Sequence, residues 1–441
     1  MNVPNNLIPL LEDACLFTLP LMMMHATATA TTNTLRPTEN RAPANQFCHA
    51  RKLADASFKN VVTPNVDTIY SQMILDLSQD DVIITLPKTD RFCTLQLLDA
   101  YTNCAAILDA SSFVHEQETF FFTRSGSGQP VPEGMIPVPL PTSMGWIIIR
   151  TICFDKADEE NVHRIQSRMK ACTRKQHLAG TADAPPAGTF DEGKNIIPSQ
   201  YVLQLSLEEY FTLANELMVQ NPPAPEDAPE LEKLSAIHVG PGLSFDPEVF
   251  GEDAPALWQA LRANLMNLTA QRSLPFFTKN GNWLYLGKPI AEFGTEYAYR
   301  AFIALFGLGA NPVSVAVYPK TDTDAAGSRL TGQNKYLLRF EKGALPPVTG
   351  HGFWSVTAYD SKDNFLIDNE LNRYCINNRS DVVWGKDGAL EIAIQAEKPA
   401  EGLANWLPVT AGEFHLVLRI YLPDETVITN QWPTPILSVK K

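Results

Sequence analysis

The sequence predicts a mainly β protein in which a helical segment separates two β-sandwiches. Short apolar runs alternate with clusters of Asp, Ser, Gly and Pro, stop for about the middle third of the chain, and return after residue 312; this texture is typical of sandwiches. The chain has 33 Pro against 24 Gly, which suits a loop-rich β protein. At 441 residues it exceeds the size of a single core. We expect an N-terminal helix and polar loop, a first β-sandwich, a helical segment and a second β domain, at residues 1–60, 61–156, 157–310 and 311–441.

The first elements follow from a change of periodicity near residue 61. Before it, an apolar run favours a helix over 7–24, followed by a polar, turn-rich loop. After it, "TIYSQMILDL" (68–77) alternates, so Ile69 and Met73 lie on one face of a strand and Tyr70 on the other. Further strands are expected in "DVIITLP", "RFCTLQLL", "ETFFFT" and "GWIIIRTICF".

The middle of the chain carries the helical signals. In "SLEEYFTLANELMVQNPP", Ser206 and Glu209 form an S-x-x-E capping box ahead of one apolar face. Residues 157–184, 254–272 and 291–306 are also expected to be helical. Strands then resume in "KYLLRF", "FWSVTAYD", "LEIAIQ" and "FHLVLRIYL".

Charge and cysteine usage restrict the partners and the compartment. The net charge of −14 and the pI near 5.1 disfavour nucleic-acid and membrane-surface roles. The seven cysteines are scattered without a CxxC pair, as in a reduced intracellular protein. The apolar run 14–24 follows two acidic residues and is too short to span a membrane, so we expect no signal peptide and a cytoplasmic location. A homodimer stays an open alternative.

No metal or cofactor is expected. "TDTDAAGSRLTGQ" has the start of a calcium loop, but Gln333 stands where the bidentate carboxylate belongs, so a hairpin turn is the better interpretation. "GLGAN" (307–311) leaves a helix and is too short for a dinucleotide fingerprint. The histidines show no metal-site spacing, and no GxSxG elbow is present.

Candidate site residues come from polar and aromatic clusters at strand ends. "VVTPNVDTIY" (61–70) crowds Asn65, Asp67 and Tyr70 at the start of a strand, and Trp146 and Arg150 share a strand face by even spacing. "LLDAYTNC" places Asp99, Tyr101 and Asn103 at i, i+2 and i+4, which would put them on one strand face. The C-terminal part adds Trp354, Tyr359, Asn372, Arg373 and Trp406. Taken singly, each residue is explained more simply by turn capping, core filling or loop pinning.

Several of these motifs resemble those of a known protein family. "PNVDTIYS…LDLS", "LQLLDAYTN" and "GWIIIRT" resemble the family called domain of unknown function 1254. "GLGANP…AVYP", "GFWSVTAYD", "LIDNELNRYCINNRS" and "NWLPVTAGEFHLVLRIY" are similar to its usual partner, domain of unknown function 1214. The resemblance implies an immunoglobulin-like sandwich, a helical insert and a jelly-roll-like sandwich. It implies no settled reaction.

We therefore expect a cofactor-independent enzyme of isomerase, cyclase or lyase type that acts on a small, partly apolar metabolite between the domains. The expected catalytic residues are Asp67, Tyr70 and Arg373. Asp67 would be the general acid/base, with its pKa raised if the pocket is dry, and Arg373 would hold a carboxylate or enolate oxygen. Tyr70 would shape the site and stack on the substrate. The expected substrate-binding residues are Asn65, Tyr101, Asn103, Trp146, Arg150, Trp354, Tyr359, Asn372 and Trp406. The alternatives are a hydrolase of a small ester and a non-catalytic small-molecule or carbohydrate-binding protein.

Overall fold

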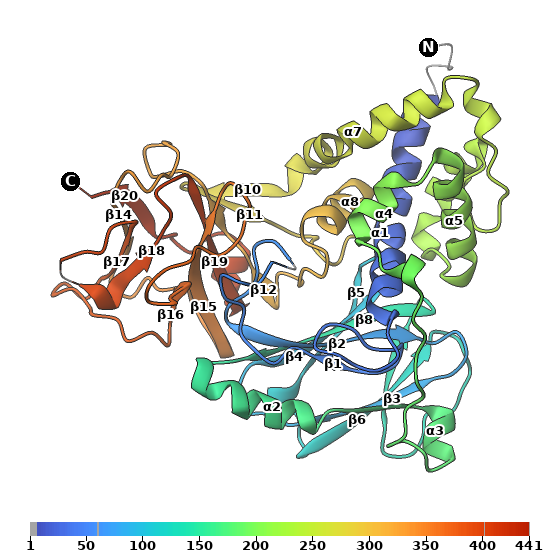
Figure 1. Cartoon of the computed structure of the whole chain (residues 1–441), viewed down its shortest axis with the longest axis horizontal. Coiled ribbons are helices and arrows are strands. Elements are labelled where there is room, and N and C mark those ends of the chain that lie inside the picture. The colour runs from blue at the N-terminus through green and yellow to red at the C-terminus, as the bar shows by residue number, and fades with distance from the viewer. Residues whose placement is uncertain (1–6, 60, 401, 441) are drawn as a thin grey trace.

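The computed structural model describes residues 7–59, 61–400 and 402–440. It confirms a mainly β protein with a helical segment: an N-terminal β-sandwich, a layer of helices and a C-terminal β domain meet near the centre of the molecule (Figure 1).

The N-terminal sandwich pairs a five-stranded sheet with a four-stranded one. The first has the order β1 (Cys48–His49), β2 (Thr68–Asp76), β8 (Met144–Ile152), β4 (Cys93–Asp99), β5 (Cys104–Asp109). The second has the order β7 (Ile136–Leu140), β6 (Gln117–Arg124), β3 (Val82–Pro87), β9 (Lys170–Thr173). Strand β9 lies beyond the expected boundary at 156. Its four residues pair with β3 and were hidden inside a stretch that looks helical.

Strand β2 has the predicted alternation. Met73 and Leu75 are buried between the two sheets. Tyr70 and Gln72 are half-buried on the opposite face, which looks toward the helices and the C-terminal domain. This outer face carries the candidate site.

The helical layer combines the N-terminal helix with the middle of the chain. Its helices are α1 (Leu7–Thr32), α4 (Pro198–Gln204), α5 (Leu207–Gln220), α6 (Ala228–Leu234), α7 (Ala254–Ser273) and α8 (Tyr297–Phe306). The short helices α2 (Glu159–Ser167) and α3 (Arg174–Leu178) flank β9. The capping box at α5 forms as predicted, because Ser206 Oγ accepts from Glu209 N at 3.2 Å and Glu209 Oε2 accepts from Ser206 N at 2.8 Å.

Helix α1 is longer than the sequence suggested. It runs for 26 residues and, by length and composition alone, is long and apolar enough to cross a membrane, as signal sequences and core helices of soluble proteins can also be. The expectation that the run is too short to span a membrane was therefore wrong, because the Ala- and Thr-rich stretch extends the helix. In this structure 67% of its most apolar window is buried, and residues such as Phe17 and Met22 pack in the helical core.

The C-terminal domain also stacks two sheets. The larger has the order β10 (Phe277–Asn280), β11 (Trp283–Leu286), β13 (Lys320–Thr321), β19 (Phe414–Pro423), β15 (Val348–Asp360), β16 (Cys375–Asn377), and β12 (Ala316–Val317) also pairs with β19. The smaller has the order β18 (Trp406–Pro408), β17 (Leu390–Gln395), β14 (Tyr336–Phe340), β20 (Ile436–Val439), and α9 (Glu425–Ile428) follows β19. Two of these strands, β10 and β11, come from within the segment predicted to be helical.

Alternation along β15 divides its side chains between two roles. Trp354 and Val356 face the core of the C-terminal domain. Ser355 and Tyr359 face the N-terminal sandwich and bond to it. The calcium-like loop is a turn, as predicted, in which Asp324 Oδ1 accepts from the backbone of Ala326 and Ser328, both at 2.9 Å.

Candidate functional site

The turn that opens β2 is held by the C-terminal domain. Asn65 Oδ1 accepts from the backbone N of Asp67 at 2.7 Å, which fixes the turn locally. Asn65 Nδ2 donates to Tyr421 Oη across the domain interface at 2.5 Å. Tyr359 Oη donates to the carbonyl of Pro64 at 2.6 Å. We call the contacts of residues 63–67 with the C-terminal sheet the interdomain clamp.

Arg419 is the buried cation of the clamp. It is 4% exposed, and its Nη2 donates to the carbonyl of Thr63 at 3.0 Å while its Nη1 donates to Thr357 Oγ1 at 3.2 Å. The guanidinium lies over the ring of Tyr359, 5.5 Å from the centroid. Burial raises the pKa of Tyr359 to about 12, although the nearby Arg419 charge lowers it. This phenol therefore stays neutral at physiological pH.

Asp67 lies at the centre of the clamp and is fully buried. Its Oδ2 accepts from Ser355 Oγ at 2.5 Å, and its Oδ1 accepts from Arg379 Nη2 at 3.3 Å and from Asn377 Nδ2 at 3.4 Å. Both carboxylate oxygens thus have donors from β15, β16 and the loop after β16. This arrangement suits a carboxylate that joins two domains.

A second buried cation, Arg150, lies on the outer face of the five-stranded sheet. Its Nη1 donates to Gln96 Oε1 at 2.7 Å and to Asn311 Oδ1 at 3.1 Å, and its Nη2 donates to the carbonyl of Gly309 at 2.7 Å. All of these acceptors are neutral, and no salt bridge joins Arg150 to a carboxylate in the described part of the chain. A guanidinium keeps its charge at any pH at which the protein is folded. The fold therefore buries a positive charge without an acidic partner.

Phenols surround this charge. Tyr70 is the cross-strand neighbour of Arg150, whose guanidinium lies 5.5 Å from the Tyr70 ring centroid. Tyr318 Oη accepts from Asn311 Nδ2 at 2.9 Å. Burial raises the pKa of Tyr318, against the effect of Arg150, and raises that of Tyr421 well above its usual value. Tyr318 and Tyr421 are therefore neutral phenols at physiological pH.

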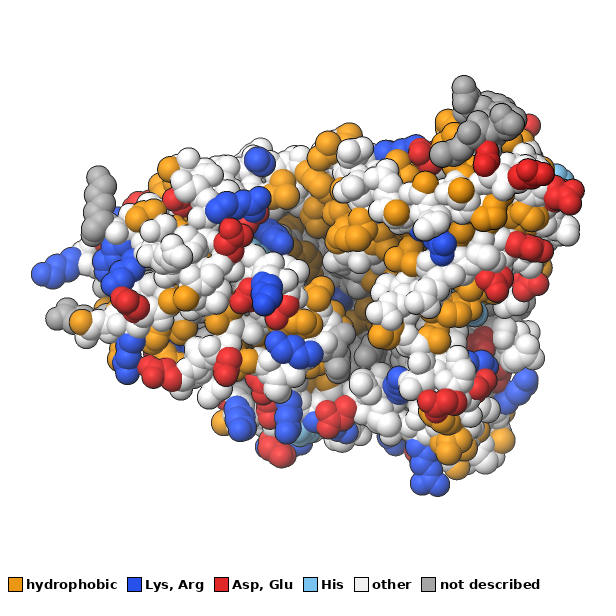
Figure 2. Space-filling model, turned by 45° about the horizontal axis from the view of Figure 1, so that its top comes forward, with side chains coloured by type: hydrophobic (Ala, Val, Ile, Leu, Met, Phe, Trp, Pro, Cys, Tyr) orange, Lys and Arg blue, Asp and Glu red, His pale blue; other side chains and the backbone are white. Residues whose placement is uncertain are grey.

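The apolar side chains on the same sheet face as Arg150 range from buried to half-buried. Met24, Leu98 and Ile148 are buried, and around them Tyr70, Cys104, Met144 and Trp146 are only half-buried. Figure 2 shows the surface hollowed between the C-terminal β domain and the helices, with hydrophobic side chains on the helical side. We call Arg150 with Tyr70, Gln96, Trp146, Asn311 and Tyr318 the Arg150 centre.

Comparison with protein families matches both β domains. The family model described as protein of unknown function DUF1254 matches residues 44–173, and the one described as protein of unknown function DUF1214 matches residues 315–425. The chain is a tandem DUF1254/DUF1214 protein. The DUF1254 match ends with β9, which agrees with the observed end of the sandwich. No curated protein matches the chain.

Solved structures of similar fold exist. The VPA0106 protein from Vibrio parahaemolyticus superposes with a TM-score of 0.72 at 21% identity, over 98% of this chain and 100% of that chain. An uncharacterized protein from Burkholderia cenocepacia reaches a TM-score of 0.48 at 13% identity, over 96% of this chain and 87% of that chain. The first likeness shows a shared fold.

The DUF1214 domain places several predicted site residues elsewhere. Trp354 packs in the core against Phe340, and Trp406 Nε1 donates to the carbonyl of Gln395 at 2.9 Å. Arg373 Nη1 donates to the carbonyls of residues 403, 404 and 406 and so holds that segment in place. Asn372 is a turn residue with a positive φ of 48°. In this structure these four side chains have structural partners.

The DUF1254 motif "LDAYTN" forms a turn, and its prediction as one strand face was wrong. Strand β4 ends at Asp99, whose Oδ1 accepts from the backbone of Tyr101 at 2.8 Å and of Asn103 at 2.9 Å. Aspartate bonding to its own backbone two and four residues on is a turn signal that competes with the strand. Tyr101 is buried against the helices, and its Oη donates to the carbonyl of Asn221 at 2.9 Å.

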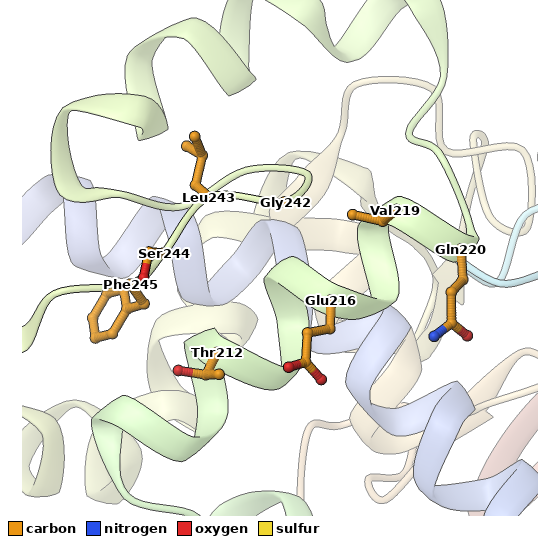
Figure 3. A pocket seen from close by; sticks show the side chains of 8 residues that line it. All are labelled: Thr212, Glu216, Val219, Gln220, Gly242, Leu243, Ser244 and Phe245. Atoms are coloured by element: carbon orange, nitrogen blue, oxygen red, sulfur yellow. The ribbon is translucent and has the colours of Figure 1, made fainter.

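Two shallow hollows lie on the helical layer and contain none of the predicted residues. One, of about 490 Å³, lies between α5 and the loop before Phe245 (Figure 3). In the close-up, Thr212 and Glu216 come from the helix and Leu243 from the loop. The other, of about 700 Å³, lies beside Trp258. Neither hollow contains a residue of the clamp or of the Arg150 centre.

Sequence reasoning missed several residues that complete the two clusters, among them Gln96, Asn311, Tyr318 and Arg419. A signal was present for two of them. Gln96 interrupts the buried apolar strand "FCTLQLL", and Arg419 is the lone charge in "FHLVLRIYL". A polar side chain on a buried strand needs a partner, so such an interruption marks a contact between domains or a site.

Proposed function

We propose that this DUF1254/DUF1214 protein is a cofactor-independent enzyme that binds a small, partly apolar anion at the Arg150 centre and converts it by acid/base chemistry of isomerase, cyclase or lyase type. The observation that carries the proposal is the buried Arg150 charge, which has only neutral acceptors. Burying an unpaired charge is costly. A ligand carboxylate or enolate would supply the missing counter-charge through a bidentate pair of bonds.

The neighbouring groups support proton transfer. Tyr70 is the half-buried phenol beside Arg150 and can exchange a proton with the ligand, while the guanidinium stabilises the negative charge that develops. Trp146 and the apolar residues around Ile148 would hold the body of the ligand. Because Asp67 is taken up by the clamp, the acid/base role first expected for it passes to Tyr70, and Asp67 becomes a positioning residue.

A non-catalytic binding protein is the second candidate. It is favoured by the observation that the carboxylate of Asp67 at the domain interface is fully buried and already bonded. Both candidates require Arg150 for binding, and only the first requires Tyr70 for turnover.

Untargeted mass spectrometry of metabolite extracts tests the proposal. Extracts are incubated with the wild type, Tyr70→Phe and Arg150→Gln, and with Tyr201→Phe on α4 as a matched control for the loss of a phenol. We expect the wild type and Tyr201→Phe to consume one feature, Tyr70→Phe to bind it without converting it, and Arg150→Gln to do neither. Equal turnover by Tyr70→Phe would refute its role. Retention of a compound without conversion by any protein would establish the binding candidate.

We further propose that the protein keeps helix α1 and acts in the cytoplasm. Removing α1 as a signal sequence would uncover the apolar surfaces of α4, α5 and α8, which pack against it. Sequencing the N-terminus of the protein isolated from its source tests this. A mature chain that begins after residue 32 would contradict it.

A further inference from the structure

Residues 307–311, which we call the strap, connect α8 to the C-terminal domain and lie directly on Arg150. The carbonyl of Gly309 accepts from Nη2 at 2.7 Å, and Asn311 Oδ1 accepts from Nη1 at 3.1 Å. Gln96 Nε2 donates to the carbonyl of Ala310 at 2.7 Å. Two oxygens of one short segment therefore occupy the two terminal nitrogens of one guanidinium.

A carboxylate also binds arginine through two N–H···O bonds, with one oxygen for each of two guanidinium nitrogens. We propose that the strap is an internal substitute for the carboxylate of the ligand, and that it leaves Arg150 when an anionic ligand binds. The inference rests on the proposed anion site and concerns its regulation. The strap oxygens carry no net charge, so a ligand carboxylate would add the Coulomb attraction of an ion pair to its hydrogen bonds with Arg150.

Two glycines give the backbone of the strap access to conformations that other residues rarely adopt. It contains Gly307 and Gly309, and Gly309 has a positive φ of 85°. A Cβ on Gly309 would lie 2.8 Å from Ile148 Cδ1, so the closed position requires glycine there. Movement of the strap would also break the bond of Asn311 to Tyr318 and free that phenol. Displacement would thus open Arg150 and release a proton donor together.

Substitutions at Asn311 test the strap in both directions. Asn311→Ala removes one of the two competing oxygens. Asn311→Asp has nearly the same shape but places a carboxylate on Arg150, which closes the strap more firmly. The probe is octanoate, an apolar carboxylate, and octanol serves as the uncharged control. Binding is measured by calorimetry on the full chain, and amide hydrogen exchange is followed over 307–311.

We expect Asn311→Ala to bind octanoate about tenfold more tightly than the wild type and Asn311→Asp about tenfold more weakly, each ratio corresponding to about 1.4 kcal/mol. Arg150→Gln should not bind. Exchange of the strap amides should be faster than in the wild type for Asn311→Ala and slower for Asn311→Asp, with strand β8 unchanged. If Asn311→Ala does not fold, Gly309→Ala replaces it and should also speed exchange.

Three results separate failure of the strap from failure of the anion site. Weaker binding by both Asn311 variants would mean that Asn311 contacts the ligand, which overturns the strap and leaves the proposed function intact. Octanoate binding unchanged by Arg150→Gln would overturn the anion site. If none of the proteins binds octanoate, amide hydrogen exchange over residues 307–311 is the deciding measurement. Equal exchange rates in the wild type and all variants would overturn the proposal.

Discussion

Replacing Asp67 with Asn should weaken the contact between the two β domains. The substitution keeps the shape of the side chain but removes its charge. One carboxylate oxygen becomes an amide group, so either Ser355 or Arg379 faces a donor where it had an acceptor. The change therefore tests whether Asp67 acts mainly as a structural link.

The structure sets the size of the effect. Losing a hydrogen bond to a charged group costs about 1.5–3 kcal/mol, and leaving a buried partner unpaired costs about 3–5 kcal/mol. The Asp67 side chain is fully buried, but that of Arg379 is 19% exposed and regains some solvation. We therefore expect Asp67→Asn to lower the free energy of unfolding by about 2–4 kcal/mol.

Urea unfolding measures this change, with Asp183→Asn as the matched control. The Asp183 side chain is 92% exposed and lies 3.7 Å from Lys170, so its loss should cost less than about 0.5 kcal/mol. If Asp67→Asn unfolds at the same urea concentration as Asp183→Asn, the structural role is refuted. Loss of turnover at unchanged stability would return the acid/base role to Asp67.

Three further predictions follow from other buried groups. Burial lowers the pKa of His49 to about 4 and that of His415 to about 3. Below about pH 6.5 the unfolded chain therefore takes up protons that the folded chain does not. The free energy of unfolding should fall from there toward pH 4, by up to about 1.4 kcal/mol per pH unit for each histidine. Urea midpoints against pH measure this, and replacing either His with Gln should flatten the profile. Burial raises the pKa of Cys48 and of Cys104 to about 12, so these two thiols should react slowly with a thiol reagent near pH 8 in the native protein. All seven cysteines should react in urea, and rapid labelling of the native protein would contradict the prediction. Arg373→Ala should lower stability by about 1–2 kcal/mol without changing ligand binding, because its bonds hold a loop, and loss of binding alone would restore its predicted contact with an oxyanion.

The parts of the fold that the sequence predicts are those with a strong local period. The alternation of β2, the capping box of α5 and the even spacing of Trp146 and Arg150 are all observed. The short strands β9 and β10 were not predicted, because each has only four residues and the flanking sequence has helical signals. Pairing with a distant strand defines such elements, and no local window contains it.

The site was predictable in part for the same reason. Sequence reasoning could find Asp67, Tyr70 and Arg150 as polar residues of strands and strand ends. It could not distinguish residues that bind a ligand from residues that hold a loop in place. In the sequence, Arg373 and Arg150 are both arginines near polar and aromatic residues, and only their hydrogen-bond acceptors separate them. Arg373 Nη1 bonds three carbonyls of one loop, whereas Arg150 reaches Gln96 in its own sheet and a segment some 160 residues away in sequence. That difference arises from tertiary packing.

The clamp and the strap divide the interface between the two domains into a fixed and a releasable part. On the fixed side, Asp67 and Arg419 are buried and each has several partners in the other domain, so separating the domains would expose buried charge. On the releasable side, Arg150 is bonded to the strap only through neutral oxygens of a glycine-containing segment. In the proposed mechanism, an anion therefore exchanges with the strap at Arg150 while the clamp keeps the two domains in register. A site that opens without domain separation needs this asymmetry, since the proposed catalysis requires Tyr70 and Arg150 to hold their relative position as the ligand arrives.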